Sequence, residues 1–289
     1  MPEPLGLIAG NGRLPLYTAR AMRDAGHRVV AVGLAGQYRD DLPPLCDTFR
    51  GVGVLRVGRW ARALRRQGVA DAVMIGGVNK SRLMYMPMAR RLATMCPDWT
   101  TARLWYRTLR HDRRSQTVMT AIADTLADAG VRLMDSTTYL PEHLADAGPL
   151  TRRRPTPGQL ADIDFGWPTL LEMNRLEVGQ AIAVRDRDVV AVEAIEGTDA
   201  MIARAGRLTG HRKNDGTGWT LLKGAGPNKD LRFDVPTVGV ATIERLAAAG
   251  AGCLAVDPGR VILLDKPAVL AAADTAKIAV WGVTPSGAV

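Results

Sequence analysis

The 289-residue chain has few cysteines, few aromatic residues and no long apolar run. Its three cysteines, Cys46, Cys96 and Cys253, are scattered and odd in number, which excludes a disulfide framework and fits no metal-ligand spacing. No stretch approaches the ~18 apolar residues that a bilayer-spanning helix requires. The first residues also lack the pattern of a secretory signal. We therefore expect a cytoplasmic protein with reduced thiols, either free or peripheral at the inner membrane.

Positive charge is what the chain has in excess, with a formal net charge of +9. Such a balance favours anionic partners, namely nucleic acid, acidic phospholipid or phosphorylated metabolites. Aromatic residues make up 5% of the chain and show no stacking pattern of the single-strand-binding kind, so we expect no nucleic acid. A membrane- or phosphate-facing surface and a plain solvated face stay open as readings of the arginine clusters. These clusters are Arg82, Arg90, Arg91, Arg103, Arg107, Arg110, Arg113 and Arg114, and Arg152, Arg153 and Arg154.

Strand and helix patterns alternate along the whole chain, which predicts an α/β protein of two domains. Prolines, glycines and an arginine triplet interrupt this alternation between 140 and 158. We therefore place an N-terminal Rossmann-like parallel-sheet domain at 1–146, a linker at 147–158 and a C-terminal α/β catalytic domain at 159–289.

Local periodicity predicts most elements of the second half. Helices are expected at 159–176, 200–208, 243–249 and 266–275, and strands at 179–184, 188–193, 219–223, 252–256, 260–264 and 277–282. In the first half, Trp99, Tyr106 and Leu109 belong to the apolar set of a helix expected within 98–130.

Two glycine turns of the first half are candidate ligand-binding loops. Gly10-Asn11-Gly12 separates the first strand from a helix, where backbone N–H groups bind phosphates or sugars. Gly77, Asn79 and Lys80 follow a buried strand, at the sheet edge where ligands bind. The first turn has neither the third glycine of the dinucleotide fingerprint nor the lysine of a P-loop. For the first turn a plain tight turn stays as open as ligand binding. For the second, a surface loop does.

Carboxylates gather at a predicted strand-to-helix turn between Val192 and Asp199. Thr198 or Asp199 could simply cap the helix that follows. Capping does not explain Glu193, which follows an apolar strand and needs a cation or a hydrogen-bonding partner if it points inward.

The segment 223–242 is the richest in groups that could carry chemistry. Lys223 and Arg232 are candidates for holding phosphate oxygens. Asp230 and Asp234 are candidate oxygen ligands of a hard divalent cation. A salt-bridged polar loop is the plainer alternative.

Three further residues of this segment, Thr237, Gly239 and Thr242, stand before a predicted helix whose N–H groups could cradle an anion. Neither histidine nor cysteine lies near, which favours Mg²⁺ or Mn²⁺ over zinc.

At these residues the sequence resembles the LpxI family, the UDP-2,3-diacylglucosamine pyrophosphatases of lipid A biosynthesis. The resemblance is carried by Ala161-Asp-Ile, Leu176-Glu-Val-Gly-Gln180, Val192-Glu-Ala-Ile-Glu-Gly-Thr-Asp199, Arg232-Phe-Asp-Val-Pro-Thr-Val-Gly239, Gly6-Leu-Ile-Ala-Gly10 and Gly76-Gly-Val78. It implies metal-dependent hydrolysis of UDP-2,3-diacylglucosamine to lipid X and UMP. It also implies that Asp234, in the family's Arg-x-Asp-x-Pro motif, is the key catalytic aspartate.

Residues and resemblance together give a full assignment. The catalytic set is Asp234, Asp230, Arg232 and Lys223; the metal ligands are Asp234, Glu193 and Asp199; the substrate-binding set is Gly10, Asn11, Gly12, Gly77, Asn79, Lys80, Thr198, Asp199, Thr237, Gly239 and Thr242. The expected partners are a nucleotide-lipid substrate, the inner membrane surface and a second copy of the chain. Gly226 and Lys229 stand where the family usually reads lysine and glutamine, which motivates an alternative, a non-catalytic binder of a phosphorylated lipid or nucleotide.

Overall fold

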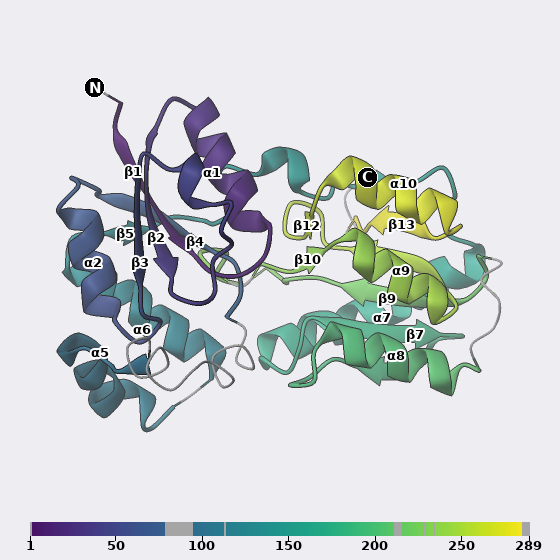
Figure 1. Ribbon diagram of the computed structural model, residues 1–289. Helices are drawn as coiled ribbons and strands as arrows, with labels where there is room; N and C mark the ends of the chain where they lie inside the picture. Colours follow the sequence, from purple (N-terminus) through teal and green to yellow (C-terminus); the bar gives the residue numbers. More distant parts are fainter. Residues whose placement is uncertain are drawn as a thin grey trace. The chain divides into compact units, whose positions relative to one another are not determined.

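The computed structural model describes residues 2–78, 95–112, 114–210, 216–227, 229–233 and 235–284. The chain divides into two compact units (Figure 1). Unit 1 contains Met1–Leu140 and Asp230–Asp234, and unit 2 contains Pro141–Lys229 and Val235–Val289. A short segment from late in the sequence therefore belongs to the first unit.

Unit 1 is built on a parallel sheet in the order β3-β2-β1-β4-β5. Its strands are β1 (Pro4–Ala9), β2 (Arg28–Leu34), β3 (Thr48–Val52), β4 (Asp71–Ile75) and β5 (Arg132–Leu133). β1, β2 and β4 are buried along nearly their whole length, as expected for parallel strands covered on both faces. Because β1 is flanked by β2 on one side and β4 on the other, a topological switch point lies between β1 and β4.

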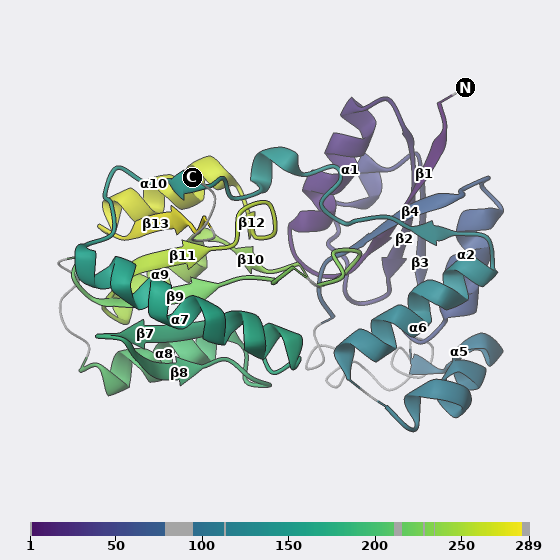
Figure 2. The ribbon, with the colours of Figure 1, turned by 180° about the vertical axis from the view of Figure 1, so that it is seen from behind.

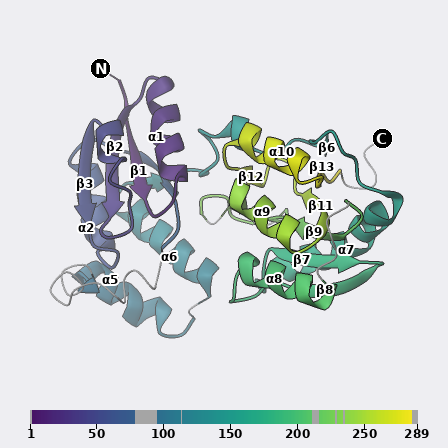
Figure 3. The same ribbon diagram turned by 45° about the vertical axis from the view of Figure 1, so that its right-hand side comes forward.

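Helices cover both faces of this sheet (Figures 1 and 3). α1 (Leu14–Asp24) lies on one face, and α2 (Val57–Arg65) and α6 (Ser115–Asp128) pack together on the other. α5 (Trp99–Leu104) continues into a π-helical turn, η2 (Trp105–Leu109), and packs against α2. A short 3₁₀ turn, η1 (Pro43–Leu45), lies between β2 and β3.

The late segment completes the core of unit 1. Phe233 is 4% exposed and belongs to the apolar cluster that contains Ile8, Trp60 and Leu126. The backbone oxygen of Leu231 accepts hydrogen bonds from the Ser136 amide at 2.9 Å and from the Ser136 hydroxyl at 2.7 Å.

Unit 2 contains a mixed sheet in the order β6-β13-β11-β9-β7-β8. β9 (Trp219–Lys223), β11 (Ala251–Val256) and β13 (Ala279–Gly282) are parallel, while β7 (Ala181–Arg185) is antiparallel to β9 and to β8 (Asp188–Val192). β6 (Gly148–Pro149) pairs antiparallel with β13. The segment 147–158, expected as a linker, therefore supplies an edge strand to this sheet and the first residues of a helix.

Helices cover both faces of this sheet (Figure 2). α7 (Pro157–Arg175) packs on the face that carries Ile182 and Val184, whereas α8 (Thr198–Leu208), α9 (Val240–Ala248) and α10 (Lys266–Thr275) accompany Ala181 and Ala183 on the other. This division follows from the two-residue period of a strand. A second small sheet pairs β10 (Thr237–Val238) with β12 (Ile262–Leu263), and η3 (Pro141–His143) begins the unit.

The expected α/β class with two domains is confirmed, since each unit has its own sheet and helices on both faces. Within the described residues, no helix combines the length and apolar character needed to cross a bilayer.

Candidate functional site

Unit 2 gathers polar groups at one edge of its sheet. β8, β9, β11 and β13 run in the same direction and end at this edge, and β7 begins there because it runs the opposite way. This carboxyl edge is where open α/β sheets bind ligands.

Glu193 and Lys223 lie on the same face of the sheet at this edge. Lys223 is opposite Ala181 in the ladder, and the Glu193 amide donates to the Ala181 carbonyl at 2.9 Å. The small Ala181 side chain between them leaves the two long side chains room to approach. Both are buried, with Glu193 6% and Lys223 4% exposed.

Thr198, the first residue of α8, connects these two buried charges. The Lys223 ammonium donates to the Thr198 hydroxyl oxygen at 2.8 Å, and that hydroxyl donates to Glu193 Oε1 at 2.7 Å. α8 has no side-chain cap at Gly197, so capping is not the role of Thr198 or Asp199. We refer to Lys223, Thr198 and Glu193 as the buried triplet.

The second oxygen of Glu193, Oε2, is buried and has no hydrogen-bond partner among the described residues. A buried carboxylate oxygen without a partner is costly unless a donor or cation satisfies it. As a hard oxygen ligand it fits a divalent cation such as Mg²⁺. The part of the chain that the structure describes holds no group of three or more His, Cys, Asp or Glu side chains that could bind a metal by itself.

Asp199 follows Thr198 but points elsewhere. Its side chain is 62% exposed, and Oδ2 lies 3.4 Å from the Arg245 guanidinium on α9. Glu196, at the same turn, pairs with Arg204 at 3.0 Å. Of the three carboxylates at this turn, Glu193 therefore contacts Thr198, whereas Asp199 and Glu196 pair with arginines.

Asp230 and Arg232 form a close pair in unit 1. The guanidinium of Arg232 donates to both carboxylate oxygens of Asp230, at distances down to 2.6 Å. These hydrogen bonds hold the pKa of Asp230 below its usual value. The pair also fixes the turn, since the Arg232 amide donates to Asp230 Oδ1 at 3.0 Å. Asp234, Asn79 and Lys80 lie outside the described residues.

The start of α9 presents open space. The Gly239 amide donates to the Thr242 hydroxyl at 3.5 Å, and a Cβ at Gly239 would meet nothing within 4 Å. Thr237 on β10 donates its hydroxyl to the Val235 carbonyl at 3.1 Å. The space beside Gly239 would admit an anion at this helix start. That Thr237, Gly239 and Thr242 bind one stays a prediction.

The two glycine loops of unit 1 are joined by backbone hydrogen bonds at the switch point. The Gly10 amide donates to Ile75 at 2.9 Å, and Asn11 and Gly77 exchange amide-to-carbonyl bonds of 2.7 and 3.1 Å. Gly12 has φ +102°, a conformation that glycine adopts without strain. α1 begins directly afterwards without a side-chain cap, as at a helix start that can receive an anion.

Two polar residues at the carboxyl edge of unit 2 were missed by sequence reasoning. Gln180 Oε1 is buried without a partner among the described residues, and burial raises the pKa of Asp257. Asp257 accepts the Gly226 amide at 3.1 Å, and Arg260 donates to the Gly226 carbonyl at 3.0 Å. Asp257 follows a buried strand, so the rule that singled out Asn79 would also have found it.

The chain matches models of two protein domains. The LpxI N-terminal domain matches residues 4–143, and the LpxI C-terminal domain matches residues 146–281. A protein of Caulobacter vibrioides, the UDP-2,3-diacylglucosamine pyrophosphatase LpxI, is 33% identical over 286 residues, which is 97% of this chain and 98% of that protein.

Proposed function

The chain belongs to the LpxI family, and from this premise we propose that it is a UDP-2,3-diacylglucosamine diphosphatase. It hydrolyses the pyrophosphate bond of this nucleotide lipid in lipid A biosynthesis and yields lipid X and UMP. The observation that carries the proposal is similarity along the full length of a named pyrophosphatase, 97% of this chain and 98% of the relative. A cytoplasmic location and a homodimer stay predictions of the sequence.

The buried triplet supports this chemistry. A pyrophosphate carries negative charge that grows on the leaving phosphate, and preorganised cations stabilise such charge most where water is excluded. Lys223, 4% exposed, offers a fixed ammonium of this kind. Thr198 orients that ammonium through a 2.8 Å hydrogen bond, and Glu193 compensates its charge through the same hydroxyl.

We further propose that the reaction requires Mg²⁺ or Mn²⁺. Glu193 would offer the ion its buried oxygen that has no protein partner among the described residues. That Asp234 also binds the ion stays a prediction of the sequence. When bound, the ion supplies a Lewis acid that polarises a phosphoryl oxygen. That Asp199 binds the ion likewise stays a prediction; its carboxylate lies 3.4 Å from the Arg245 guanidinium.

Turnover of UDP-2,3-diacylglucosamine tests this proposal. The purified protein should release UMP and lipid X in equal amounts with Mg²⁺ or Mn²⁺, and EDTA should abolish release. Asp234→Asn should lower kcat roughly a thousandfold, since both metal binding and charge placement depend on this carboxylate. Asp188→Asn, which alters an exposed carboxylate of the β7–β8 hairpin, is the matched control and should keep the full rate.

Full activity of Asp234→Asn would contradict the assignment of Asp234 as the catalytic aspartate. Binding of the nucleotide lipid without turnover in any metal would instead favour the non-catalytic binder.

The glycine at 226, where the family usually has lysine, fits the local structure: Gly226 has φ +70° and is hydrogen-bonded to Asp257 and Arg260. The loop thus requires glycine here, and a lysine would be strained.

A further inference from the structure

Unit 1 exposes aromatic side chains on α5 and η2. Trp99 is 83% exposed, Tyr106 65% and Trp105 48%, and Leu55 beside them is 37% exposed. The same segment turns Thr101 and Leu109 inward, where they are buried. Large apolar groups gathered on a surface mark an interaction site more often than a solvated face.

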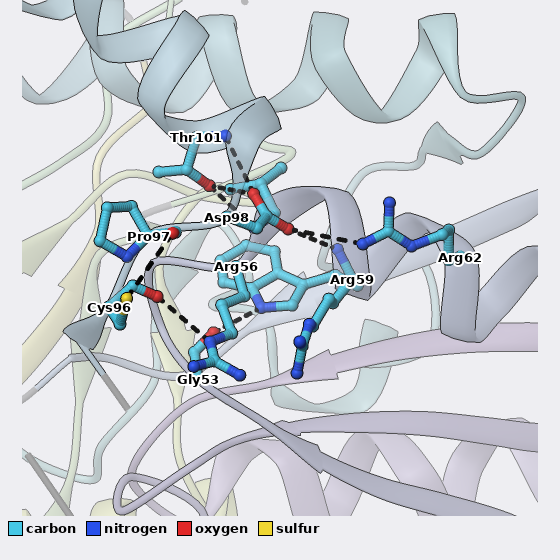
Figure 4. A network of polar contacts seen from close by, with 10 residues as sticks. Gly53, Arg56, Arg59, Arg62, Cys96, Pro97, Asp98 and Thr101 are labelled. Atoms are coloured by element: carbon cyan, nitrogen blue, oxygen red, sulfur yellow. Dashed lines mark hydrogen bonds and ion pairs between the residues drawn. The ribbon is translucent and has the colours of Figure 1, made fainter. Parts of the chain in front are cut away.

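A network of polar contacts fixes this segment to α2 (Figure 4). Asp98 Oδ1 accepts from the Thr101 amide at 3.0 Å and caps α5, while Oδ2 accepts from the Arg59 amide at 2.9 Å and caps α2. Thr101 adds a second contact to α2 by accepting from the Val57 amide at 3.1 Å. One aspartate thus caps two helices, so the exposed rings stand on a preorganised base.

Arginines surround these rings. Arg103, Arg107 and Arg110 are exposed on the same segment, and the Arg110 guanidinium lies 4.1 Å from the centre of the Tyr106 ring. Arg59 and Arg62 on α2 are also exposed, and the Arg62 guanidinium lies 3.9 Å from Asp98 Oδ2 (Figure 4). The nearby carboxylates are already engaged: Asp98 in capping both helices, and Asp112 with Arg114 at 2.7 Å. The surface is therefore strongly positive.

We propose that this aromatic–arginine surface (Trp99, Arg103, Trp105, Tyr106, Arg107 and Arg110) docks the protein on an anionic phospholipid bilayer. Tryptophan and tyrosine favour the level of the lipid headgroups because one end of each ring system is apolar and the other polar. Arginine next to them is attracted by acidic headgroups. A single-stranded nucleic acid is instead held along a groove, whereas these side chains project from the outer side of a helix.

The proposal stands apart from the proposed reaction. None of the six residues belongs to the buried triplet or to the Asp230–Asp234 segment. Its test needs neither the nucleotide lipid nor turnover, so membrane binding and catalysis fail or succeed independently.

Flotation with lipid vesicles tests the docking surface in the full-length protein. Wild type should float with vesicles of phosphatidylcholine mixed with phosphatidylglycerol, and not with phosphatidylcholine alone. Arg103→Gln with Arg107→Gln should weaken this binding roughly 25-fold, since each arginine near an anionic surface is worth about fivefold. Trp99→Ala with Tyr106→Ala should weaken it at least about tenfold, because the rings no longer enter the headgroup region.

Two exposed side chains of unit 2 provide matched controls. Ile195→Ala removes an isoleucine that is 103% exposed, and Arg207→Gln removes an exposed charge; both should bind vesicles like wild type. Each variant should keep the thermal unfolding midpoint of wild type, because the altered side chains are exposed. Wild type that does not float, or variants that float equally well, would overturn the proposal. So would binding to a single-stranded oligonucleotide that the same substitutions abolish while vesicle binding is unchanged.

Discussion

At the scale of single residues, the hydroxyl of Thr198 decides whether two buried charges are tolerated. Lys223 and Glu193 both bond to Thr198 Oγ1, at 2.8 and 2.7 Å. A buried ion pair stabilises little in itself, but breaking one leaves charges that nothing compensates. Thr198 should thus contribute more to the free energy of unfolding than an ordinary first residue of a helix.

Two substitutions of Thr198 separate the effect of its hydroxyl on stability from the effect of its side-chain shape. Thr198→Val keeps the shape and removes the hydroxyl, so it should lower the free energy of unfolding by roughly 2–4 kcal/mol. Thr198→Ser keeps the hydroxyl and should cost less than about 1 kcal/mol. Urea denaturation followed by circular dichroism measures both, and equal stability of the two variants would argue against the triplet.

The three cysteines differ in burial, and their reactivity should follow. Burial raises the pKa of Cys46 to about 11 and raises that of the fully buried Cys253 further, whereas Cys96 is exposed. Because the thiolate is the reacting form, N-ethylmaleimide at neutral pH should modify Cys96 first, Cys46 roughly a hundredfold more slowly and Cys253 only after unfolding. Mass spectrometry of timed samples gives the three rates, with the denatured protein as control. Comparable native rates at Cys46 and Cys96 would contradict this order.

At the scale of elements, the loops after β1 and β4 fit together only because glycines line their contact. An added Cβ at Gly10 would lie 2.5 Å from the Gly77 carbonyl oxygen and 2.6 Å from that of Gly76, and these backbone atoms cannot rotate away. At Gly77 an added Cβ would meet nothing within 4 Å. A side chain at Gly10 would thus clash with the backbone of the other loop, whereas Gly77 has room for one.

Alanine substitutions at Gly10 and at Gly77 should therefore have different effects. Gly10→Ala should destabilise the protein by roughly 1–3 kcal/mol because the two loops must move apart. Gly77→Ala should change stability by less than about 0.5 kcal/mol and raise the KM for the nucleotide lipid if a phosphate approaches this backbone. Thermal unfolding and steady-state kinetics measure the two effects. A stable Gly10→Ala protein would contradict the clash.

At the scale of the whole molecule, the chain closes unit 1 with a segment that comes after most of unit 2. Phe233 fills the apolar cluster of unit 1, and Ser136 holds Leu231 through two hydrogen bonds. The stability of the first unit therefore depends on residues that lie more than 90 positions further along the chain, as the separation of 95 between Ser136 and Leu231 shows.

Removal of the Phe233 ring should act on one unit. Phe233→Ala should cost roughly 3–5 kcal/mol and speed hydrogen exchange in the strands of unit 1, while β9 and β11 of unit 2 keep their protection. Phe165→Ala, at a phenylalanine of α7 that is 44% exposed, is the matched control and should leave both patterns close to wild type. Equal acceleration in both units would show that Phe233 does not belong to the core of unit 1 alone.

The local sequence predicted most elements of unit 2. The strand expected at 219–223 and the helix expected at 266–275 coincide with β9 and α10, and α8 begins at Thr198, two residues before the expected start. Glu193, Thr198 and Lys223 were also singled out from the chemistry of their side chains. The strand and helix predictions succeed because side-chain periodicity acts within a few residues.

The sequence by itself determined the α/β class, the two-domain organisation and the polar segments that carry the candidate chemistry, because these depend on neighbours along the chain. Only the tertiary structure decided that Asp230–Asp234 belongs to unit 1, that segment 147–158 supplies strand β6, and that Asp199 faces Arg245 instead of Glu193. It likewise turned Trp99 and Tyr106 outward, although both belong to an apolar helical set. These outcomes depend on contacts between segments far apart in sequence, and local periodicity carries no information about such contacts.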